Sequence, residues 1–251
     1  MPSLSSGSRV LVTGGCGFLG RHLVNVLRSR YEAVPFDVRV PDTDPSAIQG
    51  SVTDAKAVDA AMEGVSGLVI GHMAPRQPGV YDSPELPFAI NVQGAAMLFD
   101  AAARHGVKRV VLISSISVVQ ESLAAGTFLD RNTPFAPDSI YGLTKVLQEQ
   151  SAQYYHSRAG LETVILRPAY ICLGDNLEDK YGVRRPSVNW QFIDPRDIGR
   201  ATLAAFEVGQ AGCESYYLVA GPGAKDRTDV ARTETDLSWH PEYRFDTFPV
   251  D

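Results

Sequence analysis

The chain has 251 residues, 44% of them hydrophobic and 21% charged, with a formal net charge of −6. This length provides for one large domain, or for a domain with a small lobe, around a substantial core. An acidic chain without clustered basic residues is a poor partner for nucleic-acid phosphates. No apolar stretch approaches the roughly 18 residues of a membrane span, and the first eight residues do not resemble a secretory signal.

Cysteine and histidine are sparse. The three cysteines are too scattered for a disulfide framework, and the five histidines show no metal-ligand spacing. The composition therefore predicts a soluble, cytoplasmic protein with a small-molecule substrate and without a metal, membrane or nucleic-acid partner.

In chain order, β-branched apolar runs alternate with segments of helical periodicity. The pattern predicts strands at 9–12, 33–37, 67–71, 109–113 and 162–166, and helices at 18–29, 54–62, 84–103 and 139–158. Pro35 interrupts the second strand, because proline lacks the N–H that a ladder needs. Uniformly apolar strands separated by amphipathic helices are typical of an α/β fold with a doubly wound parallel sheet, the Rossmann arrangement.

The last third of the chain is less regular. Residues 172–189 are charged and rich in breakers, a short strand is predicted at 190–193, and Asp194-Pro195 opens a helix that ends near residue 207. A late strand is expected at 215–219, followed by a tail with one short helix. We expect a nucleotide-binding Rossmann domain over 1–171 and a small substrate lobe over 172–251, interleaved with the last elements of the sheet.

A glycine-rich turn, Thr13-Gly14-Gly15-Cys16-Gly17-Phe18-Leu19-Gly20, joins the first strand to the first helix. Its glycines fit both G-x-G-x-x-G and G-x-x-G-x-x-G. Missing side chains let the backbone approach a pyrophosphate, and the helix N-terminus offers unpaired N–H groups. The turn predicts a dinucleotide site, with an ordinary turn as the alternative.

Asp37 ends the second strand, about 20 residues after the turn, where a carboxylate binds the adenosine ribose and repels a 2′-phosphate. Arg39 acts in the opposite sense, because an arginine neutralises a 2′-phosphate. We therefore expect NAD as the cofactor and leave NADP as the alternative.

Tyr141 and Lys145 lie one helical turn apart on one face. A phenol with a pKa of about 10 is a poor base at neutral pH, and a nearby ammonium favours the phenolate. Such a pair is usually a solvated helix face. This one follows the strand that ends in Ser114-Ser115, whose hydroxyls would reach the same crevice and hold a substrate oxygen.

Together these residues resemble the extended short-chain dehydrogenase/reductase superfamily, in its epimerase/dehydratase branch. The resemblance covers nearly the whole chain and includes the glycine turn, Asp37, the segment 50–54, His72-Met73-Ala74, Asn91-Val92, Ser114-Ser115, Tyr141-x-x-x-Lys145 and Leu166-Arg167-Pro168-Ala169.

The resemblance implies roles for these positions. Ser115 would be the catalytic serine, Tyr141 the acid/base, and Lys145 the residue that binds the nicotinamide ribose and tunes the tyrosine. It also implies a homodimer formed through the helices 84–103 and 139–158. The cofactor-binding set would comprise Gly14, Gly17, Phe18, Leu19, Gly20, Asp37, Ser51, Val52, Met73, Ala74, Asn91, Tyr141, Lys145, Pro168 and Ile171.

Departures from the family pattern bear on the substrate. Val118-Val119-Gln120 stands where the family has Val-Tyr-Gly, and Ile116-Ser117 where the uronate dehydrogenases of this branch have Asn-His. The short lobe nevertheless resembles those enzymes and suits a substrate smaller than a nucleotide sugar. Candidate substrate contacts are Arg76, Ser115, Ser117, Arg184 and Arg185; the two last could clamp a sugar-acid carboxylate.

We therefore predict an NAD-dependent oxidoreductase acting on a small sugar-type or sugar-acid carbinol. One alternative is a nucleotide-sugar epimerase or dehydratase, in which NAD shows no net turnover. A second is a dinucleotide-sensing protein that kept the fold and lost catalysis.

Overall fold

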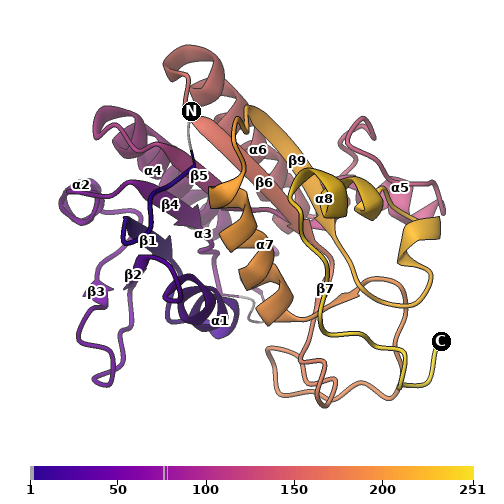
Figure 1. Cartoon of the computed structure of the whole chain (residues 1–251). Helices are drawn as coiled ribbons and strands as arrows, with labels where there is room; N and C mark the ends of the chain where they lie inside the picture. The colour runs from indigo at the N-terminus through magenta and orange to yellow at the C-terminus, as the bar shows by residue number, and fades with distance from the viewer. Residues whose placement is uncertain (1–2, 76, 78) are drawn as a thin grey trace.

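A computed structural model describes residues 3–75, 77 and 79–251 of the chain. Its centre is a seven-stranded parallel sheet in the order β3-β2-β1-β4-β5-β6-β9, which crosses Figure 1 diagonally. This confirms the predicted doubly wound fold. The strands are β1 (Arg9–Thr13), β2 (Glu32–Asp37), β3 (Ile48–Gln49), β4 (Gly67–Ile70), β5 (Arg109–Ile113), β6 (Glu162–Pro168) and β9 (Cys213–Leu218).

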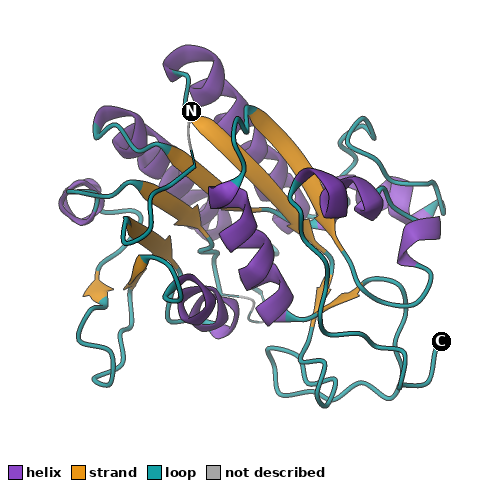
Figure 2. Ribbon diagram, in the orientation of Figure 1, coloured by secondary structure: helices purple, strands orange, loops and turns teal. Residues whose placement is uncertain are grey.

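Helices cover both faces of this sheet (Figure 2). On one face lie α1 (Phe18–Leu27) and α7 (Pro195–Glu207), packed against each other and sharing a core with β1 and β6. On the other lie α2 (Ala55–Ala61), α4 (Gly94–Arg104) and α6 (Ile140–Ala159). The sheet is thereby buried on both sides, which explains the uniformly apolar strands.

Local signals in the sequence explain where several elements begin and end. Asp54 caps α2 by accepting hydrogen bonds from two backbone N–H groups, and Ser139 caps α6 by accepting one from the N–H of Gly142. Pro35 lies inside β2 without disrupting the sheet, because β3 pairs only with Phe36 and Asp37.

The helix predicted at 84–103 is present but is not uniform. It consists of α3 (Glu85–Pro87), a π-helical segment η1 (Phe88–Gln93) and α4. By length and hydropathy, this stretch, Glu85–Arg104, is the one helix among the described residues that could cross a membrane, with a mean hydropathy of 1.2. It packs against α2 and α6, and 44% of its most apolar 18 residues is buried inside the domain.

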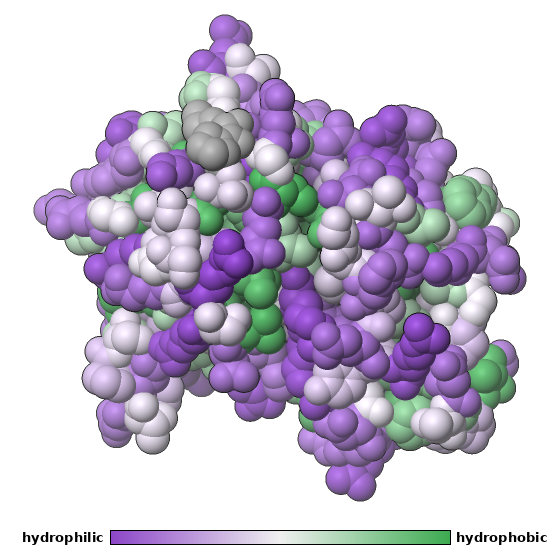
Figure 3. All heavy atoms as spheres, viewed as in Figure 1, coloured by the Kyte–Doolittle hydropathy of each residue, from purple (hydrophilic) through white to green (hydrophobic). Residues whose placement is uncertain are grey.

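The remaining elements lie beside the main sheet. They include the two-stranded sheet of β7 (Tyr170–Ile171) and β8 (Phe192–Ile193), the 3-10 turns η2 (Ile116–Val119) and η3 (Ala224–Asp226), and the helices α5 (Gln120–Ala124) and α8 (Val230–Asp236). A small core around Cys172, Val188 and Phe245 supports the loops that run along the lower right of Figure 1. On the face shown in Figure 3, hydrophobic side chains appear in small groups among hydrophilic ones.

Candidate active site

A cavity of about 670 Å³ opens at the carboxyl ends of β1, β2, β4, β5 and β6. In open α/β sheets, ligands usually bind in a crevice at the carboxyl ends of the strands. Most of the predicted site residues line it: Gly14, Gly17, Phe18, Leu19, Gly20, Asp37, Ser51, Val52, Met73, Ala74, Ser115, Ser117, Tyr141, Lys145, Pro168 and Ile171.

The glycine turn forms one end of this cavity. Gly14 has a φ of +68°, and a Cβ there would lie 2.9 Å from the Cα of His72. A Cβ on Gly20 would lie 2.0 Å from the carbonyl oxygen of Gly14. Gly17 caps α1 without a side-chain hydrogen bond, and the first residues of the helix, Phe18, Leu19 and Gly20, line the cavity. These features fit a dinucleotide pyrophosphate.

The Asp37 carboxylate lies at the edge of the same turn. Its Oδ2 accepts a hydrogen bond from the backbone N–H of Cys16 at 3.2 Å, and its Oδ1 accepts one from the N–H of Arg39 at 3.4 Å. Asp37 and Val38 line the cavity, whereas the exposed Arg39 is not among its lining residues. The placement of Asp37 fits a ribose diol.

The two serines after β5 differ in their partners. The hydroxyl of Ser114 donates a hydrogen bond to Glu149 Oε1 at 2.5 Å. Ser115 caps η2, with its Oγ 3.1 Å from both the N–H and the Oγ of Ser117. Because the Ser114 hydroxyl is committed to a buried carboxylate, Ser115 is the better candidate for holding a substrate oxygen.

Tyr141 and Lys145 extend from the first turns of α6 into the cavity. The Lys145 ammonium lies 6.0 Å from the centre of the Tyr141 ring, and the half-buried Tyr141 packs edge-on against Tyr81. Lys145 Nζ donates to the carbonyl of Ile113 at 2.8 Å and to Gln148 Oε1 at 3.0 Å.

Burial lowers the pKa of Lys145 to about 7, the Glu149 carboxylate acts in the opposite direction, and the Lys180 ammonium lowers it further. A lysine in this state changes its charge within the working range of an enzyme.

Asn91, predicted to bind the cofactor, lies behind the cavity wall and is fully buried. Its Oδ1 accepts a hydrogen bond from the N–H of Ala74 at 2.6 Å, and its Nδ2 donates to Thr144 Oγ1 at 2.9 Å. Asn91 therefore ties the loop after β4 to the helix that carries Tyr141 and Lys145.

His72 is likewise a structural residue. Burial lowers its pKa to about 3, with Lys145 as a second cause, so the ring is neutral. Its Nε2 lies 3.0 Å from the carbonyl of Ile90 and must carry the proton, which leaves Nδ1 to accept from Thr13 Oγ1 at 3.0 Å.

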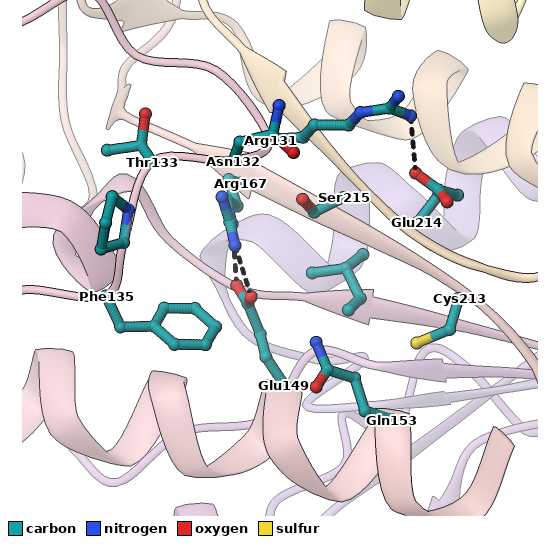
Figure 4. A pocket seen from close by; sticks show the side chains of 12 residues that line it. Arg131, Asn132, Thr133, Phe135, Glu149, Gln153, Arg167, Cys213, Glu214 and Ser215 are labelled. Atoms are coloured by element: carbon teal, nitrogen blue, oxygen red, sulfur yellow. Dashed lines mark hydrogen bonds and ion pairs between the residues drawn. The ribbon is translucent and has the colours of Figure 1, made fainter. Parts of the chain in front are cut away.

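A buried ion pair between Arg167 and Glu149 lies next to the site. Arg167 binds Glu149 through two hydrogen bonds of 3.0 and 2.7 Å and reaches the Tyr217 hydroxyl at 3.2 Å. The pair borders a second, polar cavity of about 460 Å³ between α6 and β9, where Figure 4 shows Glu149 rising from the helix toward Arg167 with Phe135 beside it. Sequence reasoning missed Glu149, although it lies one turn after Lys145.

The two arginines predicted to bind a substrate carboxylate, Arg184 and Arg185, are paired with carboxylates of this chain. Arg184 is exposed and pairs with Glu178 at 3.3 Å. Arg185 binds Asp179 at 3.2 Å and also donates to the Tyr170 hydroxyl. Neither arginine is among the residues that line the cavity. Arg76, the remaining substrate candidate, lies outside the described residues.

Other residues line the cavity instead. Gln120 and Tyr170 come from α5 and β7, and Asp179, Lys180, Tyr181 and Gln191 come from the segment between β7 and β8. Among them, Lys180 is near enough to Lys145 to lower its pKa. The sequence offered two signals for these residues: the departure from the family pattern at Gln120 and the charge of the irregular segment 172–189.

Comparisons with known proteins agree with this fold and site. Residues 10–176 match the model of the NAD dependent epimerase/dehydratase family. A uronate dehydrogenase of Pseudomonas syringae pv. tomato is 35% identical over 226 residues, covering 85% of this chain and 74% of that protein. The chain therefore belongs to the NAD dependent epimerase/dehydratase family, as the resemblance implied.

Two further relatives are similar along nearly their whole length. L-Arabinose 1-dehydrogenase (NAD(P)(+)) of Haloferax volcanii is 31% identical over 244 residues, covering 91% of this chain and 93% of that protein. A crystal structure of a short-chain dehydrogenase/reductase superfamily protein from Agrobacterium tumefaciens with bound NAD has a TM-score of 0.80, with 25% identity over 95% of this chain and 94% of that one.

Proposed function

We propose that the protein is an NAD-dependent dehydrogenase that oxidises a carbinol of a small sugar or sugar acid. The observation that carries this proposal is the arrangement along one cavity: the glycine turn and Asp37 at one end, and Ser115, Tyr141 and Lys145 at the other. Relatives named for uronate and L-arabinose oxidation support the substrate class.

The residues at the two ends of the cavity would have different roles in the reaction. The glycine turn and the N-terminus of α1 would hold the pyrophosphate, and Asp37 the adenosine ribose. Ser115 would orient the substrate oxygen, and Tyr141 as a phenolate would take the hydroxyl proton, stabilised by the Lys145 ammonium. NAD, when bound, supplies the acceptor for the hydride that leaves the carbinol carbon.

The lobe supports a substrate smaller than a nucleotide sugar. The segment that joins β7 to β8 spans residues 172–191 and contributes Asp179, Lys180, Tyr181 and Gln191 to the lining of the cavity. The Lys180 ammonium favours an anionic substrate such as a sugar acid, because an acid would offset the positive charge that Lys180 adds beside Lys145.

The test is net NADH formation, followed by absorbance, over a panel of sugar acids and neutral sugars. Tyr141→Phe should abolish turnover while leaving NAD affinity nearly unchanged, because it removes only the hydroxyl that exchanges the proton. NADH formation by the Phe variant would refute the role of Tyr141. An epimerase would interconvert sugars without net NADH, and a sensing protein would bind NAD without converting any sugar.

We further propose a cytoplasmic homodimer formed through the helices at 84–103 and 139–158, with residues 172–251 supplying the substrate lobe. Large apolar side chains are exposed on these helices: Leu86 at 45%, Leu143 at 39% and Tyr154 at 56%. Light scattering of Leu143→Glu should report a monomer if the interface lies there. An unchanged dimer would place the interface elsewhere.

A further inference from the structure

Gln148 lies on α6 one turn after Lys145, and its side chain is fully buried. Buried amides in helices need partners for both ends of the amide. Its Oε1 accepts the hydrogen bond from Lys145 Nζ at 3.0 Å, and its Nε2 donates to the backbone carbonyl of Asn91 at 2.7 Å. One side chain thus connects the lysine of the site to the π-helical segment η1.

The orientation of this amide is fixed by its surroundings. A backbone carbonyl only accepts hydrogen bonds, so the NH₂ group of Gln148 must face Asn91. The amide oxygen is then forced toward Lys145. A hydrogen bond from a charged donor is stronger than one from a neutral amine, so an acceptor held here favours the ammonium form.

The other groups around Lys145 divide between the two signs of charge. The carboxylate of Glu149, on the same helix, favours the ammonium, and Lys180, from the lobe, disfavours it. Arg167, on β6, is paired with Glu149. On the sheet side His72 is neutral, because burial lowers its pKa to about 3. Tyr141, on the same helix, completes the set.

We propose that Gln148 is a positioning residue that keeps Lys145 protonated and aimed at Tyr141, through an amide oxygen that Asn91 holds in place. The inference rests on the proposed role of Lys145 in catalysis. The amide of Gln148 carries no titratable proton in this range, so it favours the ammonium equally at every pH at which the enzyme works.

A purely structural Gln148, which only fastens α6 to η1, makes a different prediction. Its loss would lower stability and leave the titration of Lys145 unchanged. The titration of this lysine therefore separates the two roles, and it is measurable in the protein without cofactor or substrate.

The chain suits this measurement because it contains five lysines: Lys56, Lys108, Lys145, Lys180 and Lys225. With ¹³C at lysine Cε, each NMR signal reports the charge of one ammonium, and Lys145→Met identifies the signal of interest. Gln148→Leu should lower the titration midpoint of Lys145 by about one pH unit, the size expected for one lost hydrogen bond to a charged group.

Gln148→Glu should raise the midpoint, because a carboxylate replaces the amide oxygen, and it serves if the leucine variant fails to fold. The control is Gln153→Leu, the same substitution at an exposed position of α6 that makes no hydrogen bond to Lys145. It should leave the midpoint in place. Midpoints that are the same in wild type, Gln148→Leu and Gln148→Glu would overturn the inference.

Kinetics add a second readout. A midpoint that falls from about 7 to about 6 reduces the charged fraction at pH 7 from about one half to about one tenth, so kcat/KM should fall about fivefold in Gln148→Leu. An active wild-type enzyme with an unmoved lysine midpoint refutes this inference alone. A wild-type protein that oxidises no sugar refutes the proposed function, and the NMR titration still decides the role of Gln148.

Discussion

Breaking the Glu149–Arg167 pair should destabilise the protein more than removing both partners. The exposed side-chain fractions are 1% for Glu149 and 4% for Arg167, so the loss of either partner leaves a charge in the core. Such losses cost about 3–5 kcal/mol. We therefore expect Glu149→Met and Arg167→Met each to lower the free energy of unfolding by this amount, which corresponds to roughly 6–20 °C in Tm for a chain of this size.

The double variant provides the decisive comparison. It leaves no unpaired charge. Ser114 loses the acceptor of its hydroxyl, and the Tyr217 hydroxyl loses Arg167 but keeps the carbonyl of Asp130 at 3.3 Å, at about 1 kcal/mol for each lost hydrogen bond. The double variant should thus lose about 2 kcal/mol, far less than the sum of the single losses. Because Arg167 also packs over Phe135, with its guanidinium carbon 5.6 Å from the ring centre, a methionine keeps most of the contact area.

Urea unfolding followed by circular dichroism, at one pH and salt concentration, measures all four proteins. As a control, Asp100→Asn removes an exposed pair with Arg104 and should leave the unfolding midpoint unchanged. Additive losses in the Glu149 and Arg167 variants would refute the reasoning, because they would mean that the two charges are solvated independently.

Three further predictions concern the proposed cofactor-binding end of the cavity and the pKa of Lys145. Asp37→Ala should weaken NAD binding about 10–100-fold, from the loss of charge-assisted hydrogen bonds, and reduce discrimination against NADP; unchanged selectivity in calorimetry would exclude the ribose contact. Gly20→Ala should lower Tm, because its Cβ would lie 2.0 Å from a carbonyl oxygen, whereas Gly17→Ala, with 3.3 Å, should mainly weaken NAD binding. Burial lowers the pKa of Lys145 to about 7, against about 10.4 when unfolded, so between these values the unfolded chain binds more protons. Wild-type stability relative to Lys145→Met should therefore rise with pH between about 7 and 10, and a constant difference would contradict this assignment.

The fold could be predicted from the sequence because its signals are local. The central strands β1, β4 and β5 are mainly apolar, Asp54 and Ser139 mark helix starts, and Gly14 and Gly20 stand where only glycine fits. The π-helical segment η1 could not be predicted, because one extra residue in a turn barely changes the hydrophobic periodicity of a helix.

The sequence could not predict which side of α6 is buried, for a different reason. Its core-facing residues include Thr144, Lys145, Gln148 and Glu149, which in a sequence are typical of a solvated helix face. Only their tertiary partners, Asn91 and Arg167 among them, make their burial possible. For the same reason, the sequence could not show that Arg185 binds a carboxylate of its own chain.

The charge of Lys145 and the recognition of the substrate depend largely on different residues. Burial is the largest influence on the charge of Lys145, followed by the carboxylate of Glu149, which does not line the cavity. Lobe residues can therefore change with the substrate while these two influences stay constant. Lys180 is the exception, because it lines the cavity and also lowers the pKa of Lys145. An anionic substrate that pairs with Lys180 would cancel part of this effect and favour the charged lysine at the moment of binding. In the proposed reaction, the charge of the substrate and the protonation of Lys145 would therefore be coupled through Lys180.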